Sequence, residues 1–162
     1  METKKYESTS EAMEYLKDYL FAELNLLTPF VLIDPDGLVD LSEHIPYPYR
    51  EYDLATMKDG ELEKFLKEIS HIDKPIILLR NIESVSSLKE KEDWKNIIVD
   101  GLREESKTFV LKNDECIGGL TEYRLPFDKV KLICTCHQYP DFLKNKGNLG
   151  KGPDFTHVVD SE

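Results

Sequence analysis

The segment Lys-Pro-Ile-Ile-Leu-Leu-Arg-Asn-Ile-Glu at residues 74–83 constrains the fold more than any other part of the chain. Its four consecutive apolar residues, 76–79, follow a proline and show no alternation with polar residues. This pattern is typical of a strand that is buried on both faces, as in the centre of a parallel sheet. A chain with such a strand needs helices on both faces of its sheet, and the remaining segments must supply them.

Amphipathic segments predict these helices. Apolar residues recur at three- and four-residue intervals over residues 8–27, and Pro29 ends this first helix. A second helix is predicted from about Asp59, and a third over about residues 88–105. Each has one apolar face, as expected for a helix that packs against a sheet.

Short apolar segments between the helices predict the other strands, at residues 30–33, 49–55 and 130–134, with a short terminal strand at 158–159. Because strands alternate with helices, we predict an α/β fold of three layers, in which helices flank a mostly parallel sheet. Two further apolar segments flank Asn-Asp and Gly-Gly pairs, which predicts a β-hairpin inserted around residues 107–126.

The chain shows no internal repeat and no low-complexity linker. Its length of 162 residues is usual for one domain. We therefore predict a single α/β domain over residues 1–162, with an N-terminal helical region (1–27) and a core (28–143). A tail rich in glycine and lysine follows (144–162) and contains the short terminal strand.

Charge and composition exclude some classes of partner. Lysine and arginine total 21 against 32 acidic residues, so the formal charge of −11 opposes direct binding to nucleic acid. The negative charge either only keeps the protein soluble or forms an acidic face that binds a basic partner. Apolar runs fall far short of the roughly 20 residues of a membrane span, and we expect no membrane partner. Three cysteines without an apolar leader segment predict reduced thiols and a cytoplasmic location.

The order of these segments resembles the nucleotide-binding core of the AAA+ ATPases, a P-loop NTPase family. The similar segments are 30–33 (first strand), 49–56 (second strand), 76–83 (Walker B strand and its exit), 132–137 (sensor 1 strand) and 152–159 (arginine-finger segment). The resemblance covers about residues 28–160. It implies that five strands, numbered along the chain from residue 30, lie in the order 5-1-4-3-2.

The residues of ATP hydrolysis are replaced at three places. After Ile33 the chain has Asp-Pro-Asp-Gly instead of a Walker A loop, whose backbone N–H groups and lysine hold phosphates. Arg80 and Asn81 stand where the family's acidic pair binds magnesium and orients water. Asp154 stands where a finger arginine is expected. We therefore predict a catalytically inactive relative, with no catalytic, cofactor-binding or metal-binding residue and no cofactor. Its expected role is as a protein-binding or assembly module, with another protein or another copy as partner.

A second interpretation places a ligand at the carboxyl edge of the sheet. This edge is where open α/β folds bind ligands, and its candidate residues are Asp34, Asp36, Asp53, Glu83 and His137. The chain would then be a small enzyme or a ligand- or metal-binding domain with its site at residues 34–37. The same Asp-Pro-Asp-Gly turn also suits carboxylates that cap backbone amides. A third interpretation is an acidic inhibitor or nucleic-acid mimic that occupies a basic surface.

The Cys134-x-Cys136-His137 motif admits a zinc site or a Cys–His nucleophile. Along a strand the two cysteines lie on one face and His137 on the other, so zinc would need distant ligands. Buried, unreactive cysteines at the end of a strand are the preferred explanation of the motif. Tyrosines at 47, 49 and 52 suit either a protein interface or packing of the strand that begins near them.

Overall fold

The computed structural model of the chain describes residues 4–6, 14, 16–18, 20, 30–34, 40–102, 107–113, 119–138, 140–144 and 156–159. The strands are β1 (Lys4–Tyr6), β2 (Phe30–Ile33), β3 (Tyr49–Asp53), β4 (Ile76–Arg80), β5 (Lys107–Asn113), β6 (Gly119–Leu125), β7 (Lys131–Cys136) and β8 (Thr156–Val159). The α-helices are α2 (Leu62–Ser70), α3 (Lys91–Leu102) and α4 (Asp141–Lys144), and the 3₁₀ helices are η1 (Leu41–Glu43) and η2 (Ile82–Ser87). None of the helices among these residues is long and apolar enough to cross a membrane.

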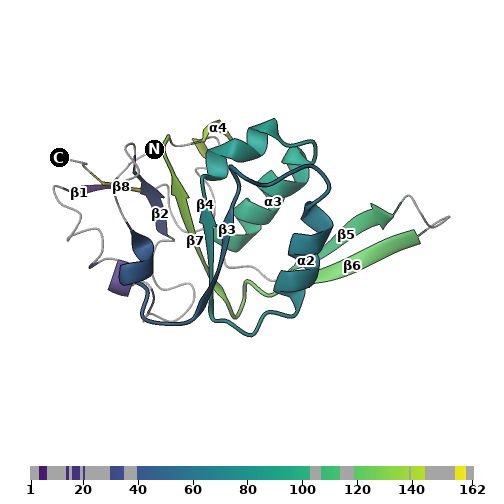
Figure 1. Cartoon of the computed structure of the whole chain (residues 1–162), viewed down its shortest axis with the longest axis horizontal. Helices are drawn as coiled ribbons and strands as arrows, with labels where there is room; N and C mark the ends of the chain where they lie inside the picture. The colour runs from purple at the N-terminus through teal and green to yellow at the C-terminus, as the bar shows by residue number, and fades with distance from the viewer. Residues whose placement is uncertain are drawn as a thin grey trace.

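Six of the strands form one parallel sheet in the order β1-β8-β2-β7-β4-β3 (Figure 1). Numbered along the chain from β2, the last five positions of this list have the order 5-1-4-3-2. The buried strand β4 lies between β7 and β3, and its four apolar residues are at most 2% exposed. The predicted α/β class with a helix-flanked parallel sheet is confirmed.

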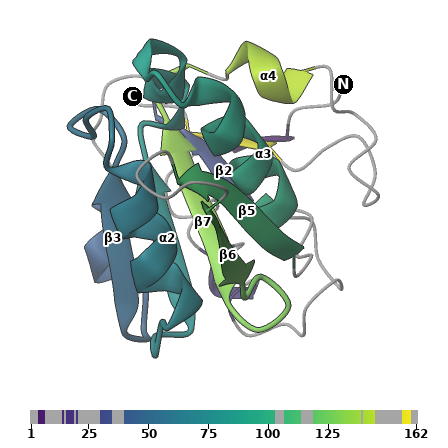
Figure 2. The same cartoon turned by 90° about the vertical axis from the view of Figure 1, so that its right-hand side faces the viewer.

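The alternating side chains of β4 divide the interior into two cores. Ile77 and Leu79 belong to the larger core, which α2 and α3 cover on the same side of the sheet (Figure 2). Ile76 and Leu78 belong to the smaller core on the opposite face, together with Leu16 and other apolar residues. Residues 14, 16–18 and 20 are helical, so helices flank the sheet on both faces and give the three predicted layers.

The predicted hairpin is also confirmed. Strands β5 and β6 pair antiparallel over seven residues each and form a separate two-stranded sheet. Tyr123 and Leu125 of β6 are buried in the larger core, and Phe109 of β5 packs against it. The far end of the hairpin extends beyond α2, away from the main sheet (Figure 1).

Several boundaries differ from the prediction for physical reasons. Residues 4–6 form a strand within the region predicted as helical, because β8 from the other end of the chain pairs with them. Helix α3 starts three residues later than predicted, since η2 ends in an extended Leu88. Asp59 lies before α2, and its carboxylate accepts a hydrogen bond from the backbone N–H of Lys89 at 2.7 Å. The rest of the predicted helix at 8–27 lies outside the described residues.

The close packing of α3 on β7 predicts a specific stability effect at Gly101. An added Cβ would lie 2.3 Å from Leu132 Cδ2 and 3.2 Å from the Phe127 ring. We expect Gly101→Ala to destabilise the fold by about 1–3 kcal/mol through overpacking, which outweighs a gain of about 1 kcal/mol in helix propensity. Urea unfolding measures the difference. Asn96→Ala on the exposed face of the same helix is the control and is expected to be neutral or slightly stabilising.

Candidate functional site

The carboxyl ends of four neighbouring strands surround a cavity of about 180 Å³. The described residues that line it are Leu32, Asp34, Asp53, Arg80, Asn81, Thr135, Cys136 and His137. Three of the predicted edge residues, Asp34, Asp53 and His137, therefore lie at one site. Glu83 lies next to it and contacts His137, whereas Asp36 is outside the described residues. The sequence did not predict Thr135 as a residue of this site. Thr135 lies opposite Leu32 in the register of β2 and β7.

Asp53 joins the ends of β3 and β4. Its Oδ1 accepts a hydrogen bond from Asn81 Nδ2 at 2.8 Å and another from the backbone N–H of Ala55 at 2.9 Å. Asn81 has φ 57° and ψ 49°, a left-handed conformation that asparagine adopts more readily than most residues. The side-chain hydrogen bond helps to hold this conformation. One oxygen of Asp53 is thus committed to the structure of the cavity wall.

Arg80 brings a permanent positive charge to the cavity. Its guanidinium lies 3.7 Å from Glu51 Oε2, and its side chain is about one-third exposed. Nearby, hydrogen bonds from Ser42 lower the pKa of Asp40, and the charge of Arg80 lowers it further to a smaller extent. Because arginine stays protonated, it repels a metal cation from this place. Within the described part of the chain, no group of three His, Cys, Asp or Glu residues is arranged to hold a metal ion.

Glu83 accepts hydrogen bonds from the backbone just after the end of β7. Its Oε2 accepts hydrogen bonds from the backbone N–H of His137 at 2.6 Å and of Gln138 at 3.2 Å. His137 Nδ1 lies 3.8 Å from the same oxygen. The carboxylate therefore links η2 to the segment after β7. Glu83, which the sequence predicted as a ligand candidate, satisfies backbone donors.

The two described cysteines lie on the same face of β7, as predicted, and both are buried in the larger core. Burial raises the pKa of both thiols above the ordinary value. The thiol of Cys136 donates a hydrogen bond to the carbonyl oxygen of Leu32 at 3.7 Å. Thiols in such surroundings are poor nucleophiles at neutral pH, so the structure favours the interpretation as unreactive core residues. Cys116 lies outside the described residues.

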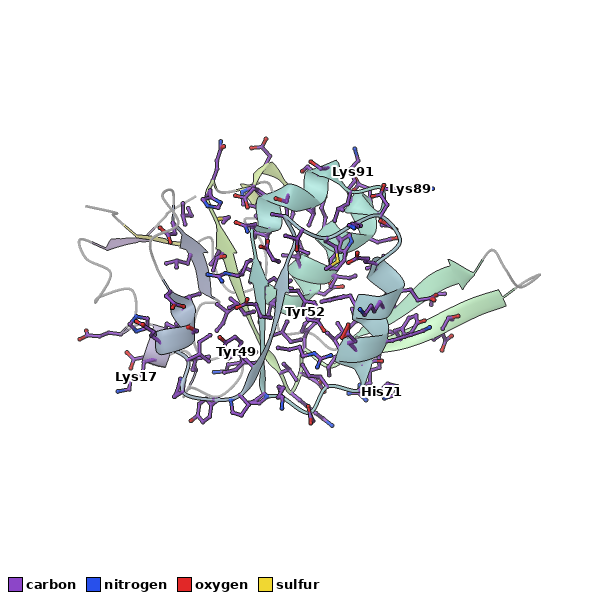
Figure 3. The ribbon with its side chains drawn as sticks, in the orientation of Figure 1. Lys17, Tyr49, Tyr52, His71, Lys89 and Lys91 are labelled. Atoms are coloured by element: carbon purple, nitrogen blue, oxygen red, sulfur yellow. The ribbon has the colours of Figure 1, made fainter. Side chains whose placement is uncertain are left out.

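The tyrosines of β3 serve packing. Tyr52 contacts Phe65 of α2 edge to face, with ring centroids 4.7 Å apart, and Figure 3 shows it beside that helix. Tyr49 packs against the smaller core on the other face of the sheet. Tyr47, which precedes the strand, is 37% exposed. Of the predicted interface tyrosines, only this one presents substantial surface.

No protein-family model and no curated protein matches the chain. The interpretation of the cavity therefore depends on its geometry and chemistry.

The role of Glu83 can be tested by its effect on stability. Glu83→Ala leaves two backbone N–H groups without their acceptor, and we expect a loss of about 1–3 kcal/mol. Glu83→Gln keeps an acceptor oxygen and should lose less. Urea unfolding gives the free energies, and amide hydrogen exchange at His137 and Gln138 locates the effect.

Glu92→Ala is the matched control, because Glu92 is an exposed glutamate on α3 with only a surface ion pair to Lys95. Equal stability of the Glu83→Ala and Glu92→Ala variants would contradict the structural role of Glu83.

Proposed function

We propose that this chain is a non-hydrolysing, AAA+-like α/β domain that acts as a protein-binding or assembly module. The observation that supports this most is the placement of Arg80. It stands at the end of the buried strand β4, which is strand 3 of the 5-1-4-3-2 order, and lines the cavity at the carboxyl edge.

The electrostatics of this cavity oppose magnesium-dependent chemistry. In AAA+ ATPases the corresponding strand ends in two carboxylates that bind magnesium and orient water. Here Arg80 carries the opposite charge, and the amide of Asn81 donates to Asp53. A magnesium ion would meet a guanidinium instead of a ligand pair.

The size of the cavity also opposes binding of a nucleotide within it. Its volume of about 180 Å³ equals that of roughly six water molecules, at ~30 Å³ each. Pockets for drug-sized ligands start at roughly 300 Å³. A parallel sheet in the order 5-1-4-3-2 that lacks both an acidic pair and space for a nucleotide supports a role in which the surface of the domain carries the function.

Phosphate release from ATP tests this proposal. We expect the full chain with ATP and Mg²⁺ to release no phosphate above a protein-free blank, because Arg80 displaces the metal site. Phosphate release that both Asp34→Asn and Glu83→Gln abolish would refute the proposal. These conservative substitutions separate activity of this cavity from a contaminating ATPase.

A second candidate function is the binding of a small polar ligand. The specific observation in its favour is that the cavity gathers Asp34, Asp53 and His137 with the oppositely charged Arg80. Groups of both charges suit a ligand that itself carries both a negative and a positive or hydroxyl group. The volume restricts such a ligand to a small metabolite.

A thermal-shift screen of small polar metabolites tests the second candidate. A ligand of this cavity is expected to raise the melting temperature of the natural chain and to lose this effect in Arg80→Ala. Arg50→Ala is the matched control, since Arg50 pairs with Glu68 at 2.5 Å and does not line the cavity. If every shift survives in Arg80→Ala, the ligand binds elsewhere.

A further inference from the structure

The outer edge of β5 has no strand beside it among the described elements. Within that part of the chain β5 pairs only with β6, which packs in turn against α2. A two-stranded hairpin gains little stability by itself and depends on packing or on further strands. An open edge seven residues long offers backbone N–H and C=O groups to another strand.

The sequence of this edge gives it little protection against pairing at its centre. Val110, at its centre, is 48% exposed, which is the highest value for a large hydrophobic residue among the side chains that the structure describes. Edges that avoid pairing are often very short or carry lysines, other charged residues, a proline or a bulge. In β5 the lysines are Lys107 and Lys112, and the three residues between 108 and 112 are Phe-Val-Leu.

We propose that β5 is a self-association edge, on which β5 of a second copy of this chain pairs antiparallel. The pairing is centred on Val110 and makes a four-stranded sheet in the order β6-β5-β5-β6. The inference rests on the proposed function as an assembly module and names the surface and the partner.

The sequence of β5 is complementary to itself in this register. A two-fold axis through Val110 places Lys107 opposite Asn113, Thr108 opposite Lys112, and Phe109 opposite Leu111. No charge meets a like charge, and apolar residues meet apolar residues at the centre. All seven residues of the strand are used. A two-fold interface requires a surface of this kind, which matches its own copy.

Neighbouring registers are poorer. The two-fold axis of an antiparallel pair passes midway between two copies of the same residue. The neighbouring registers are therefore centred on Phe109 or Leu111, and each pairs five residues of β5. The first leaves Lys112 and Asn113 outside the ladder. The second places Val110 opposite Lys112, which removes the apolar match at the centre. The register centred on Val110 is therefore favoured.

The overall charge of the chain makes the salt dependence of this dimer informative. Two copies with a formal charge of −11 each repel one another. Backbone hydrogen bonds and apolar contact at the edge depend little on salt, whereas the repulsion is screened by it. The dimer is therefore expected to become tighter as ionic strength rises. An interface held by ion pairs would show the opposite dependence.

Analytical ultracentrifugation of the full chain over a range of concentrations tests the proposal. We expect a reversible monomer–dimer equilibrium. In Val110→Lys and in Val110→Glu, like charges meet at the axis, and the dissociation constant should rise at least about tenfold. Glu122→Lys is the matched control, because Glu122 lies opposite Val110 within the hairpin but on β6, and this variant should still dimerise.

Mixing the two charge variants gives the decisive result. Val110→Lys and Val110→Glu, each monomeric alone, are expected to form a mixed dimer, because the axis places residue 110 of one copy opposite residue 110 of the other. This outcome also shows that both variants are folded. A natural chain that stays monomeric at every concentration, or a mixture that stays monomeric, would overturn the inference.

The failure of this inference and that of the proposed function are distinguishable. A monomeric chain without ATPase activity leaves the binding module standing with a different partner. Magnesium-dependent ATP hydrolysis refutes the proposed function and leaves the dimer to be judged by ultracentrifugation alone.

Discussion

The burial of β4 on both faces is the constraint on which the rest of the structure depends. Four consecutive apolar side chains, alternating between two cores, need a layer of helix on each side and a strand on each flank. The chain supplies α2 and α3 on one face and the helical residues 14, 16–18 and 20 on the other. Arg80 is the first residue of β4 that is not buried, so the sheet becomes polar at the point where this strand ends. The position of the cavity follows from that change.

The carboxyl edge is held by contacts that each join two neighbouring strand ends. The backbone N–H of Asp34 donates a hydrogen bond of 2.9 Å to the carbonyl oxygen of Cys136, which joins β2 to β7. The N–H of Leu54 donates to the carbonyl of Arg80 and joins β3 to β4. Asp53 adds a side-chain acceptor to the β3–β4 connection, and Glu83 joins η2, which follows β4, to the segment after β7. Much of the acidity at this edge therefore serves backbone donors that the ends of the strands leave open.

The periodic segments of this sequence predicted their own structure well. The sequence correctly predicted the buried strand β4, the apolar faces of α2 and α3, and the hairpin, because each of these has a local sequence pattern. The strand β1 and the exact role of Glu83 could not be read in this way. Residues 4–6 become a strand through pairing with residues 157–159, and Glu83 meets the backbone of His137, 54 positions away. Partners so distant in sequence leave no local signal. The meeting of Asp34, Asp53 and His137 at one edge was predictable, since Asp34 and His137 follow parallel strands and Asp53 is the last residue of one.

Arg80 places a permanent positive charge among the acidic groups of this edge. The cavity and its surroundings hold the carboxylates of Asp34 and Asp53, and Glu51 lies beside the guanidinium. In a site that binds magnesium, the ion neutralises carboxylates of this kind and the site loses that charge when the ion leaves. A guanidinium is part of the chain and stays protonated at every relevant pH. Arg80 thus supplies positive charge at this edge from the chain itself. This permanent charge is compatible with the proposed assembly module, a role that requires no magnesium ion at the edge.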